Sequence, residues 1–561
     1  MRTFLTAWLL ALLALVLSCP SLAQGWQWSR HFGGPGHDFG QVGAVDAAGN
    51  VYCFGNYANS GPGTYHDLYI GQDTLEGTLA GYIAKYDEEG TMLWALNFAC
   101  DNVSGRLSVT SMILDSSAST LIITGGHWSS CTIGSISLPD SGAYLAKVDL
   151  DGNCFWAANI GSARTAGKGL VLNDQDELFV SGTISHFGTS YVGDQAIAPG
   201  SFLAKYSPDG TQLWAKSLTI GVGTQGYSRY TPYTLQYKGG FIYAHGPCFG
   251  SPNGEPIVAD SITIPMSQGV DLLAALDANT GVAVWLRDFG LGSSGGTYGY
   301  DNRMRVSGTG AVYCIGSIYD GGSAFFSSDT TVLLPPNGLS YLVKYSPSGV
   351  LLQLHTYDRI GMGAIDVTQD GSILITGYVI NEPITLDVCS GASGQGLFVT
   401  RMDSIGNCIN MIATGYATGT SILQTAQGIY LTATTPPSPQ FNTNTLLGES
   451  VTSYGFEDVL LAKLDLSLGV QSFSIGGNDG LNIYANPNQG SFQVQVPEAI
   501  ANAPHLELKI YDAMGRLVLS QGIGTEDTHP QLDLYDVGPG LYAVSLTDGR
   551  RVYHGNMVVE Q

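Results

Sequence analysis

Two short glycine-rich stretches have spacings that serve chemistry in other proteins. Gly221-Val222-Gly223-Thr224-Gln225-Gly226 fits the pattern that cradles dinucleotide phosphates, and Gly292-Ser293-Ser294-Gly295-Gly296 fits a serine nucleophile elbow. Both motifs need a helix after the glycines, because the helix N-terminus presents its N–H groups to the anion. No helical pattern follows either stretch, and a chain with 75 glycines matches such patterns by chance. We predict that both are loops without chemistry.

Metal ligation has one candidate. Asp149-Leu150-Asp151-Gly152-Asn153 offers side-chain oxygens of the kind that calcium prefers. The same residue types are required by a tight turn between strands, for backbone reasons, and we favour the turn. No histidine pair has zinc spacing. Paired carboxylates for glycoside cleavage have no local signature, since a repeat fold collects them from distant segments. We therefore expect no cofactor, with calcium at 149–153 as the alternative.

The composition limits both the fold and the partners. The chain has 561 residues, 44% of them hydrophobic and only 12% charged, with a formal net charge of −24. Such an acidic surface repels phosphates, so a nucleic acid partner is not expected. Abundant glycine disfavours long helices and suits short strands with tight turns. The length suggests two to four domains.

A phrase built around a lysine recurs seven times between residues 82 and 465. Its clearest copies begin at Tyr82, Tyr144 and Phe202, and the last of the weaker copies is 461–465. The copies are 57 to 70 residues apart. A tryptophan follows the lysine by nine residues in the first three copies, and the fourth copy also has one; these are Trp94, Trp156, Trp214 and Trp285. A repeat of this length is the signature of a repetitive architecture.

Each repeat predicts four strands, which in the first copy lie near 41–46, 51–57, 81–87 and 91–98. The first two strands and the last two are joined by tight turns, whereas the middle link is long. Seven such units predict an all-β, seven-bladed β-propeller over residues 24–470. The last copy has no fourth strand, but residues 26–32 resemble one. We expect this N-terminal strand to complete the seventh blade and remove a free sheet edge.

The repeats resemble the secreted bacterial β-propeller repeat family, often called SBBP. The resemblance covers about residues 26–470 and rests on the Asp-x-x-Gly-Asn-hydrophobic-Tyr phrase, the Ala-Lys-Tyr-Asp phrase and the tryptophan. It implies the propeller fold and no particular activity.

In a propeller, the links between blades cross toward the channel mouth on the face that carries the long loops. Five of the nine arginines of residues 24–470 fall in these links, together with several tyrosines. Arginine binds carboxylate or sulfate groups and tyrosine stacks on sugar rings, so these links form a candidate ligand site. Alternatively, each arginine pairs with a nearby Asp, such as Asp101, Asp301 or Asp358, and braces adjacent blades. The candidate residues are Arg106, Arg164, Tyr227, Arg229, Tyr230, Tyr298, Tyr300, Arg303 and Arg359.

The last eighty or so residues have a different pattern. After a Gly-rich linker at 471–480, about seven short alternating strands predict a small immunoglobulin-like β-sandwich at 481–561. Its phrases resemble the type A C-terminal sorting domain of the type IX secretion system, and the residues that carry the resemblance are Asn486, Pro487, Gly490, Asp512, Gly515, Arg516, Gly540 and Tyr542. The resemblance implies translocation across the outer membrane. Tail removal with attachment to surface lipopolysaccharide, or release, commonly follows.

The N-terminus predicts export. Arg2, an apolar run from Leu9 to Leu17 and Ser21-Leu22-Ala23 form a signal peptide over residues 1–23; a lipoprotein signal with Cys19 is the alternative. No later segment is apolar enough to span a membrane.

The eight remaining cysteines therefore reach an oxidising compartment. Cys53 and Cys314 lie within predicted strands and fit buried thiols. The other six lie nearer loops and could pair, with the connectivity left open: Cys100, Cys131, Cys154, Cys248, Cys389 and Cys408.

These observations favour an exported, non-catalytic propeller that binds an extracellular glycan or protein. The alternatives are a polysaccharide-degrading enzyme with its site at the channel mouth, and a purely structural or adhesive surface protein.

Overall fold

The computed structural model describes most of the chain from Trp26 onward. The described residues are 26–58, 67–76, 80–100, 105–184, 190–220, 230–248, 256–264, 270–289, 303–318, 322–327, 330–335, 339–358, 360–368, 371–379, 385–386, 389–390, 396–415, 417–435, 444–446, 449–451, 454, 457–465, 481–497, 500–501, 503, 506–512, 517–524, 528–534, 537–547 and 552–559. The predicted signal peptide, the linker at 471–480 and both glycine motifs lie outside these residues. Every regular element within them is a β-strand.

The chain divides into two compact units, residues 1–468 and 469–561. The described part of the first unit contains seven antiparallel sheets, each built on four strands that correspond to one repeat; a hairpin extends two of them to six strands. From the inner strand outward they are β2 (His37–Val45), β3 (Val51–Ala58), β6 (Ala80–Tyr86) and β7 (Met92–Cys100); β8 (Leu107–Asp115), β9 (Thr120–His127), β12 (Gly142–Asp149) and β13 (Cys154–Asn159); β14 (Thr165–Leu172), β15 (Leu178–Ile184), β18 (Gly200–Tyr206) and β19 (Gln212–Ile220); β20 (Thr234–Lys238), β21 (Phe241–Cys248), β24 (Val270–Asp277) and β25 (Ala283–Phe289); β26 (Met304–Val306), β27 (Val312–Ile318), β30 (Leu339–Tyr345) and β31 (Leu351–Tyr357); β32 (Ile360–Val367), β33 (Ile373–Val379), β36 (Gly396–Met402) and β37 (Cys408–Thr414); and β38 (Thr418–Thr425), β39 (Gly428–Thr434), β42 (Val459–Leu464) and β1 (Trp26–Phe32).

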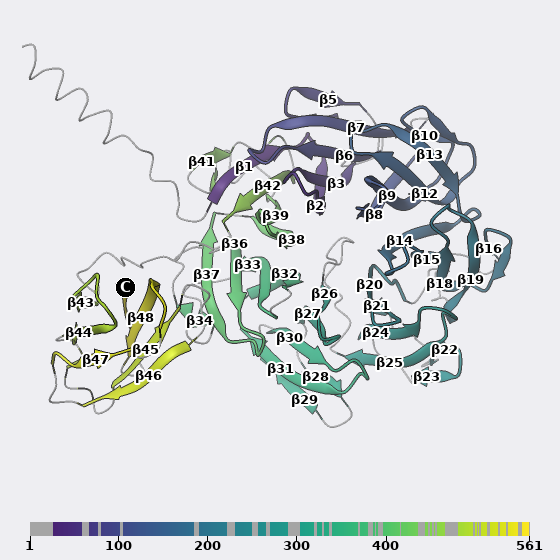
Figure 1. Cartoon of the computed structure of the whole chain (residues 1–561). Coiled ribbons are helices and arrows are strands. Elements are labelled where there is room, and N and C mark those ends of the chain that lie inside the picture. The colour runs from purple at the N-terminus through teal and green to yellow at the C-terminus, as the bar shows by residue number, and fades with distance from the viewer. Residues whose placement is uncertain are drawn as a thin grey trace, which may run out of the picture. The chain divides into compact units, whose positions relative to one another are not determined.

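The sheets follow one another around a common centre (Figure 1). The first strand of each sheet lies beside the first strand of the next, and β38 of the last sheet lies beside β2 of the first. Apolar side chains from adjacent sheets share each core cluster, so the sheets are held together by face-to-face burial. The arrangement is propeller-like.

The N-terminal strand belongs to the last sheet. β1 pairs antiparallel with β42, from Trp26 opposite Leu464 to Phe32 opposite Val459. The prediction that residues 26–32 supply the missing fourth strand is confirmed. Without β1, the strand β42 would present an unpaired edge. The first residues of the described chain cover this edge.

The long middle link of each repeat contains a short hairpin that the strand prediction missed. These hairpins are β4 (Leu68–Ile70) with β5 (Asp73–Leu75), β10 (Cys131–Ile133) with β11 (Ile136–Leu138), β16 (Ser190–Val192) with β17 (Gln195–Ile197), β22 (Ile257–Ala259) with β23 (Ile262–Ile264), β28 (Gly322–Ser327) with β29 (Thr330–Leu334), β34 (Thr385–Leu386) with β35 (Cys389–Ser390), and β40 (Asn444–Leu446) with β41 (Glu449–Val451). β10 pairs with β7, and β22 pairs with β19. These two hairpins therefore cover the outer strand of the preceding sheet, where an edge would otherwise be bare.

The recurring tryptophan has a structural role, which we call the latch. In four sheets its indole Nε1–H donates to a backbone carbonyl in the turn between the third and fourth strands of the next sheet. The four bonds are Trp28 to Glu88 at 2.8 Å, Trp94 to Leu150 at 3.1 Å, Trp214 to Asn279 at 3.0 Å and Trp285 to Pro347 at 3.0 Å. The recurring lysine lies opposite the tryptophan and makes the same kind of bond, for example from Lys85 to the Leu150 carbonyl at 2.9 Å. The repeat signature thus encodes contacts between sheets.

The second unit has two antiparallel sheets whose apolar side chains form one core. One sheet consists of β43 (Asn482–Tyr484), β44 (Ser491–Gln495) and β47 (Gln531–Asp533); the other consists of β46 (Leu517–Ile523), β45 (Leu506–Tyr511), β48 (Gly540–Thr547) and β49 (Val552–Val559). In the described part of the chain, no helix is long and apolar enough to cross a membrane.

Candidate functional site

Four of the nine predicted ligand residues lie in described segments, and only two of them are exposed. Arg106 and Arg164 are exposed, whereas Arg303 keeps 9% of its surface accessible. Tyr230 is completely buried, and its hydroxyl donates to the Ala244 carbonyl at 2.9 Å. Tyr230 is therefore wrong as a surface ligand residue, because its ring belongs to the core beneath the link. Tyr227, Arg229, Tyr298, Tyr300 and Arg359 lie outside the described residues.

The two exposed arginines lie near two exposed aromatic rings that the sequence reading missed. Trp128, which follows β9, is 57% exposed, and Tyr191 in the hairpin strand β16 is 52% exposed. We call Arg106, Trp128, Arg164 and Tyr191 the Trp128 patch. Tryptophan and tyrosine rings have an apolar face and a polar edge, and they are enriched where proteins bind ligands and partners.

Backbone contacts hold the two halves of this patch together. The Trp128 N–H donates to the Arg106 carbonyl at 3.0 Å, which places these two residues side by side. Across the patch, the Ser162 N–H donates to the Tyr191 carbonyl at 2.9 Å, and the Tyr191 N–H donates to the Ser162 hydroxyl at 3.0 Å. Arg164 lies in the turn that follows, with a positive φ of 67°.

Glycines let the second and third sheets approach closely at this point. Gly142 pairs with His127, and a Cβ on Gly142 would lie 2.1 Å from the Gly161 carbonyl oxygen. A Cβ on Gly126 would lie 2.9 Å from the Ala166 Cβ. The residues beside Trp128 are thus in contact with those beside Arg164. The four residues of the patch therefore lie at the ends of strands and links that meet at the boundary between the two sheets.

Polar contacts hold the side chain of His127, the residue before Trp128, in place. Its Nε2 lies 2.6 Å from the Asn159 Oδ1 and its Nδ1 lies 2.8 Å from the Ser129 carbonyl. Among the described residues neither Arg106 nor Arg164 forms an ion pair; Asp101, the suggested partner of Arg106 in the bracing alternative, lies outside them. Two guanidinium groups beside two flat rings can bind an anionic, ring-containing ligand.

Two buried carboxylates of the described residues lie near each other where β1 joins the last sheet. Asp38 is 2% exposed and accepts the Gly34 N–H at 2.5 Å, while the fully buried Asp458 lies 3.3 Å from the His31 Nε2. Burial, with smaller contributions from the charges of Asp458 and Glu457, raises the pKa of Asp38 to about 8. A protonated acid beside a second carboxylate is the pairing that glycosidases use. Both groups are buried, however, so a polysaccharide cannot reach them in this structure.

Hydrogen bonds within the turn hold residues 149–153, the segment of the calcium alternative. Asp149 Oδ1 accepts the N–H groups of Asp151 and Asn153, at 3.0 and 2.8 Å, and its Oδ2 accepts the Asn153 side-chain amide at 2.9 Å. The carboxylate closes its own turn. No group of three His, Cys, Asp or Glu side chains within the described ranges is arranged to hold a metal ion.

The cysteines separate into two groups. Cys100 and Cys131 form a disulfide that fixes the β10–β11 hairpin to β7. Cys408 is also disulfide-bonded. Cys53, Cys154, Cys248 and Cys314 carry thiols outside these disulfides, and Cys53 and Cys314 are buried as predicted.

The sorting motif closes the end of the second unit. Asn486 Oδ1 accepts the Val558 N–H at 2.8 Å, and the Tyr542 hydroxyl donates to the Gly538 carbonyl at 2.6 Å. The side-chain oxygen of the buried Asn488 accepts the Gly490 N–H at 2.7 Å. Pro487 and Gly490 shape this turn, Gly540 begins β48 and Asp512 follows β45. Gly515 and Arg516 lie outside the described residues.

Comparisons with solved structures find distant similarities. A quinohemoprotein alcohol dehydrogenase from Pseudomonas putida is 11% identical, with 83% of this chain and 80% of that chain covered and a TM-score of 0.37. A Trypanosoma rangeli sialidase is 9% identical, with 93% and 85% covered and a TM-score of 0.34. An endo-arabinanase from Bacillus licheniformis is 12% identical, with 66% and 96% covered and a TM-score of 0.25. These values are too low to support an argument about fold or activity.

No curated protein matches the chain. One family model does: the secretion system C-terminal sorting domain matches residues 482–560, the segment whose turn Asn486 and Asn488 close. The tail of this chain is therefore a type IX C-terminal sorting domain, and the protein is exported across the outer membrane to the cell surface or released.

Proposed function

We propose that the first unit is a non-catalytic binding module for an extracellular glycan that carries acidic groups, and that the Trp128 patch contacts it. The observation that carries the proposal is the presence of two half-exposed aromatic rings and two exposed arginines where the second and third sheets of an acidic protein meet. Aromatic rings stack on sugar C–H faces, and guanidinium groups bind carboxylates or sulfates in two-pronged fashion. A partner protein is the second possibility for the same patch.

The proposal includes the architecture and processing of the chain. We infer a signal peptide at 1–23, a seven-bladed β-propeller at 24–470 completed by β1, a linker at 471–480 and a β-sandwich at 481–561. The seven four-stranded sheets and the pairing of β1 with β42 support the propeller. Attachment to surface lipopolysaccharide after tail removal, or release, would present the patch outside the cell.

The enzyme alternative rests on Asp38 and Asp458. The raised pKa of Asp38 beside a second carboxylate favours an enzyme. The burial of both carboxylates argues against one, unless β1 and the last sheet separate from β2 to admit a substrate. A purely structural or adhesive surface protein needs no ligand patch, and the exposed rings of Trp128 and Tyr191 argue against that reading.

The test is binding of the full-length protein to an array of neutral, carboxylated and sulfated glycans. Trp128→Ala and Tyr191→Ala should each weaken binding about tenfold or more, the equivalent of about 1.4 kcal/mol. Arg106→Gln combined with Arg164→Gln should selectively remove binding to the charged glycans. Phe155 is the matched control, because it is an aromatic residue with a similar exposure, 55%, on the outer strand β13.

Unchanged binding in all three patch variants, or an equal loss in Phe155→Ala, would overturn the proposal. Release of reducing ends from a bound polysaccharide, lost in Asp38→Asn, would favour the enzyme instead.

A further inference from the structure

Four sheets of the first unit share a β-bulge at the same place on the innermost strand, which faces the common centre of the sheets (Figure 1). Each bulge follows the residue that pairs with an equivalent position of the second strand, namely Gly125, Gly182, Gly377 or Ala433. A bulge leaves its extra residue out of the strand pairing, so the side chain can leave the regular pleat. The unpaired residues are Thr110, Lys168 with Gly169, Gly363 and Thr420.

The bulges outside the third sheet carry small residues that fit against the innermost strand of the next sheet. The Thr110 hydroxyl donates to the Gly167 carbonyl at 2.8 Å, and the Thr420 hydroxyl donates to the Gly40 carbonyl at 3.1 Å. The remaining bulge residue is a glycine. The bulge therefore forms without a long or charged side chain, and the geometry of the strand does not account for the lysine at position 168.

The ammonium of Lys168 is partly buried and has no acceptor. Its Nζ lies 5.2 Å from the centroid of the Tyr233 ring, which comes just before β20 in the next sheet. Within the described part of the chain, this ammonium forms no hydrogen bond and no ion pair. Burial lowers the pKa of Lys168 to about 8, because no neighbouring carboxylate offsets the loss of water. A positive charge held in this way costs free energy, which a bound anion would offset.

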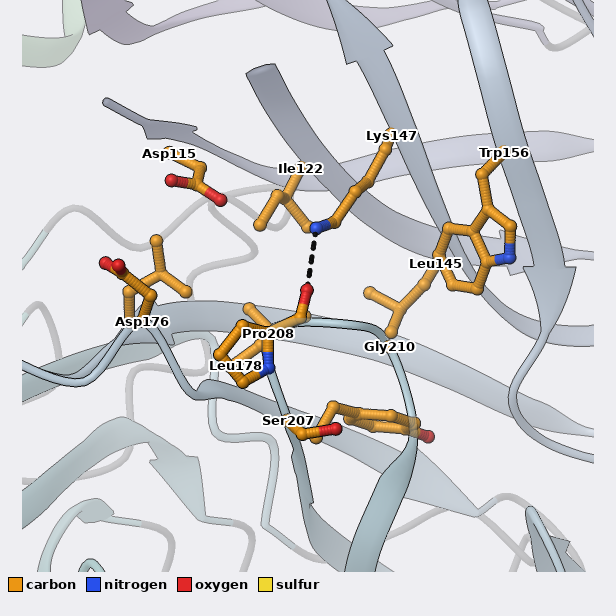
Figure 2. Close-up of a pocket in the computed structure, with 12 residues that line it drawn as sticks. Asp115, Ile122, Leu145, Lys147, Trp156, Asp176, Leu178, Ser207, Pro208 and Gly210 are labelled. Atoms are coloured by element: carbon orange, nitrogen blue, oxygen red, sulfur yellow. Dashed lines mark hydrogen bonds between the residues drawn. The ribbon is translucent and has the colours of Figure 1, made fainter. Parts of the chain in front are cut away.

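The other lysines, all of which lie in described segments, have the partners that Lys168 lacks. Seven of them bond to a backbone carbonyl or a carboxylate. For example, Lys147 Nζ donates to the Pro208 carbonyl at 3.3 Å (Figure 2), and Lys205 Nζ lies 2.6 Å from the Glu177 carboxylate. The remaining one, Lys238, is exposed, so water solvates its charge. Among these lysines, only Lys168 is both partly withdrawn from water and without an acceptor.

We propose that Lys168 is an anion-binding group on the innermost strand of the third sheet, and that it takes one oxyanion group: a carboxylate, a sulfate or a phosphate. An ammonium only donates hydrogen bonds, and the oxygens of an oxyanion only accept them. Bonds between such charged partners are stronger than bonds between neutral ones. The Tyr233 ring attracts the ammonium and holds it in place while no anion is bound. The site does not rest on the proposed function, because no residue of the Trp128 patch belongs to it.

The test measures how fast acetic anhydride labels each lysine of the full-length protein at about pH 7.5, with peptide mass spectrometry as the readout. Sodium acetate, sodium sulfate and sodium phosphate are the probes, each compared with sodium chloride at equal ionic strength. Only the unprotonated amine reacts, so an anion that binds Lys168 should slow its labelling about fivefold or more in at least one of the three. Lys238 is the matched internal control, and its labelling rate should be equal in all four salts.

Substitutions of Lys168 separate anion binding from packing. An anion that binds only the folded protein raises Tm, so the protecting anion should raise Tm of the wild type more than that of Lys168→Met, relative to chloride. Lys168→Arg keeps a cation and should retain the wild-type rise, as should Lys238→Met, which removes an exposed charge. If Lys168→Met does not fold, the labelling of the wild type decides alone.

Three results would overturn the proposal. The first is equal labelling of Lys168 in all four salts, and the second is a wild-type rise of Tm in Lys168→Met. The third is loss of the labelling protection in Trp128→Ala, because it would assign the anion to the Trp128 patch instead. Protection that persists in Trp128→Ala supports a separate site, whether or not the patch binds a glycan.

Discussion

At the residue scale, the recurring tryptophan carries most of the structural information in the repeat. Trp94 is half-buried, packs on Tyr52 and donates to the Leu150 carbonyl, whereas Trp156 has neither contact. Trp94→Leu should therefore lower the free energy of unfolding of the first unit by about 2 kcal/mol. Trp156→Leu should cost less than half as much. Calorimetry of the full-length protein resolves the two transitions; a larger loss for Trp156→Leu would contradict the latch.

The buried carboxyl of Asp38 makes a second prediction at this scale. Its folded pKa, about 8, lies above the ordinary 3.8, so the folded protein holds a proton that the unfolded chain releases above about pH 4. Stability should thus be full below about pH 4 and fall as the pH rises through about 8. Asp38→Asn should remove this loss and raise Tm at about pH 9 relative to the wild type.

Several charged side chains lie around Asp38, so the control must leave them in place. These side chains are His31, Glu457 and Asp458, and all three are unchanged in Asp38→Asn. Asp194→Asn, on an exposed hairpin turn, should keep the wild-type pH dependence. An identical pH profile in the wild type and Asp38→Asn would disprove the assignment.

At the scale of elements, strands were predictable because their alternation and tight turns repeat. The predicted 51–57 corresponds to β3 at Val51–Ala58, and 91–98 to β7 at Met92–Cys100. The hairpins in the long links were missed because each strand has only two to six residues, too few for periodicity to be visible. Their turns did leave a signal: Gly71, Gly134 and Gly193 all have φ between 57° and 60°, which mirror-image hairpin turns require.

One hairpin is fixed covalently, and its release can be measured. The Cys100–Cys131 disulfide closes a 31-residue separation and holds β10 on the edge of β7. The chain-entropy model assigns such a loop about 3–4 kcal/mol. Cys100→Ala with Cys131→Ala should lower Tm of the first unit and speed hydrogen exchange of the β7 amides. Cys154→Ser, which removes a half-buried free thiol, should change neither the Tm nor the exchange rates. Equal hydrogen-exchange rates of the β7 amides in the two variants would show that the disulfide is not needed to hold β10 on β7.

At the scale of the whole molecule, the sequence predicts the repeated strands and the sorting tail better than it predicts the site. The repeat and the tail motifs are local patterns, so they can be read along the chain. The Trp128 patch joins residues from four separate segments, and the sequence predicts only Arg106 and Arg164 among them. Trp128 and Tyr191 carry no repeat signal. Their exposure depends on how the second and third sheets approach, which glycines such as Gly142 permit. The prediction that Tyr230 is a surface ligand residue was wrong for the same reason. A link between sheets can place a ring in the core as well as on the surface.

The division into two units predicts that delivery and folding are separable. The first unit has its own cores, and β1 completes its last sheet without help from the tail. A chain that ends at residue 470 should therefore keep the thermal transition of the first unit and its glycan binding. It should nevertheless stay in the periplasm, because the sorting domain at 482–560 is the part that the type IX machinery reads. Surface proteolysis of intact cells and calorimetry of the purified chain check the two halves of this prediction. A truncated chain that reaches the surface would refute the role of the tail, and one that no longer unfolds cooperatively would refute the independence of the first unit.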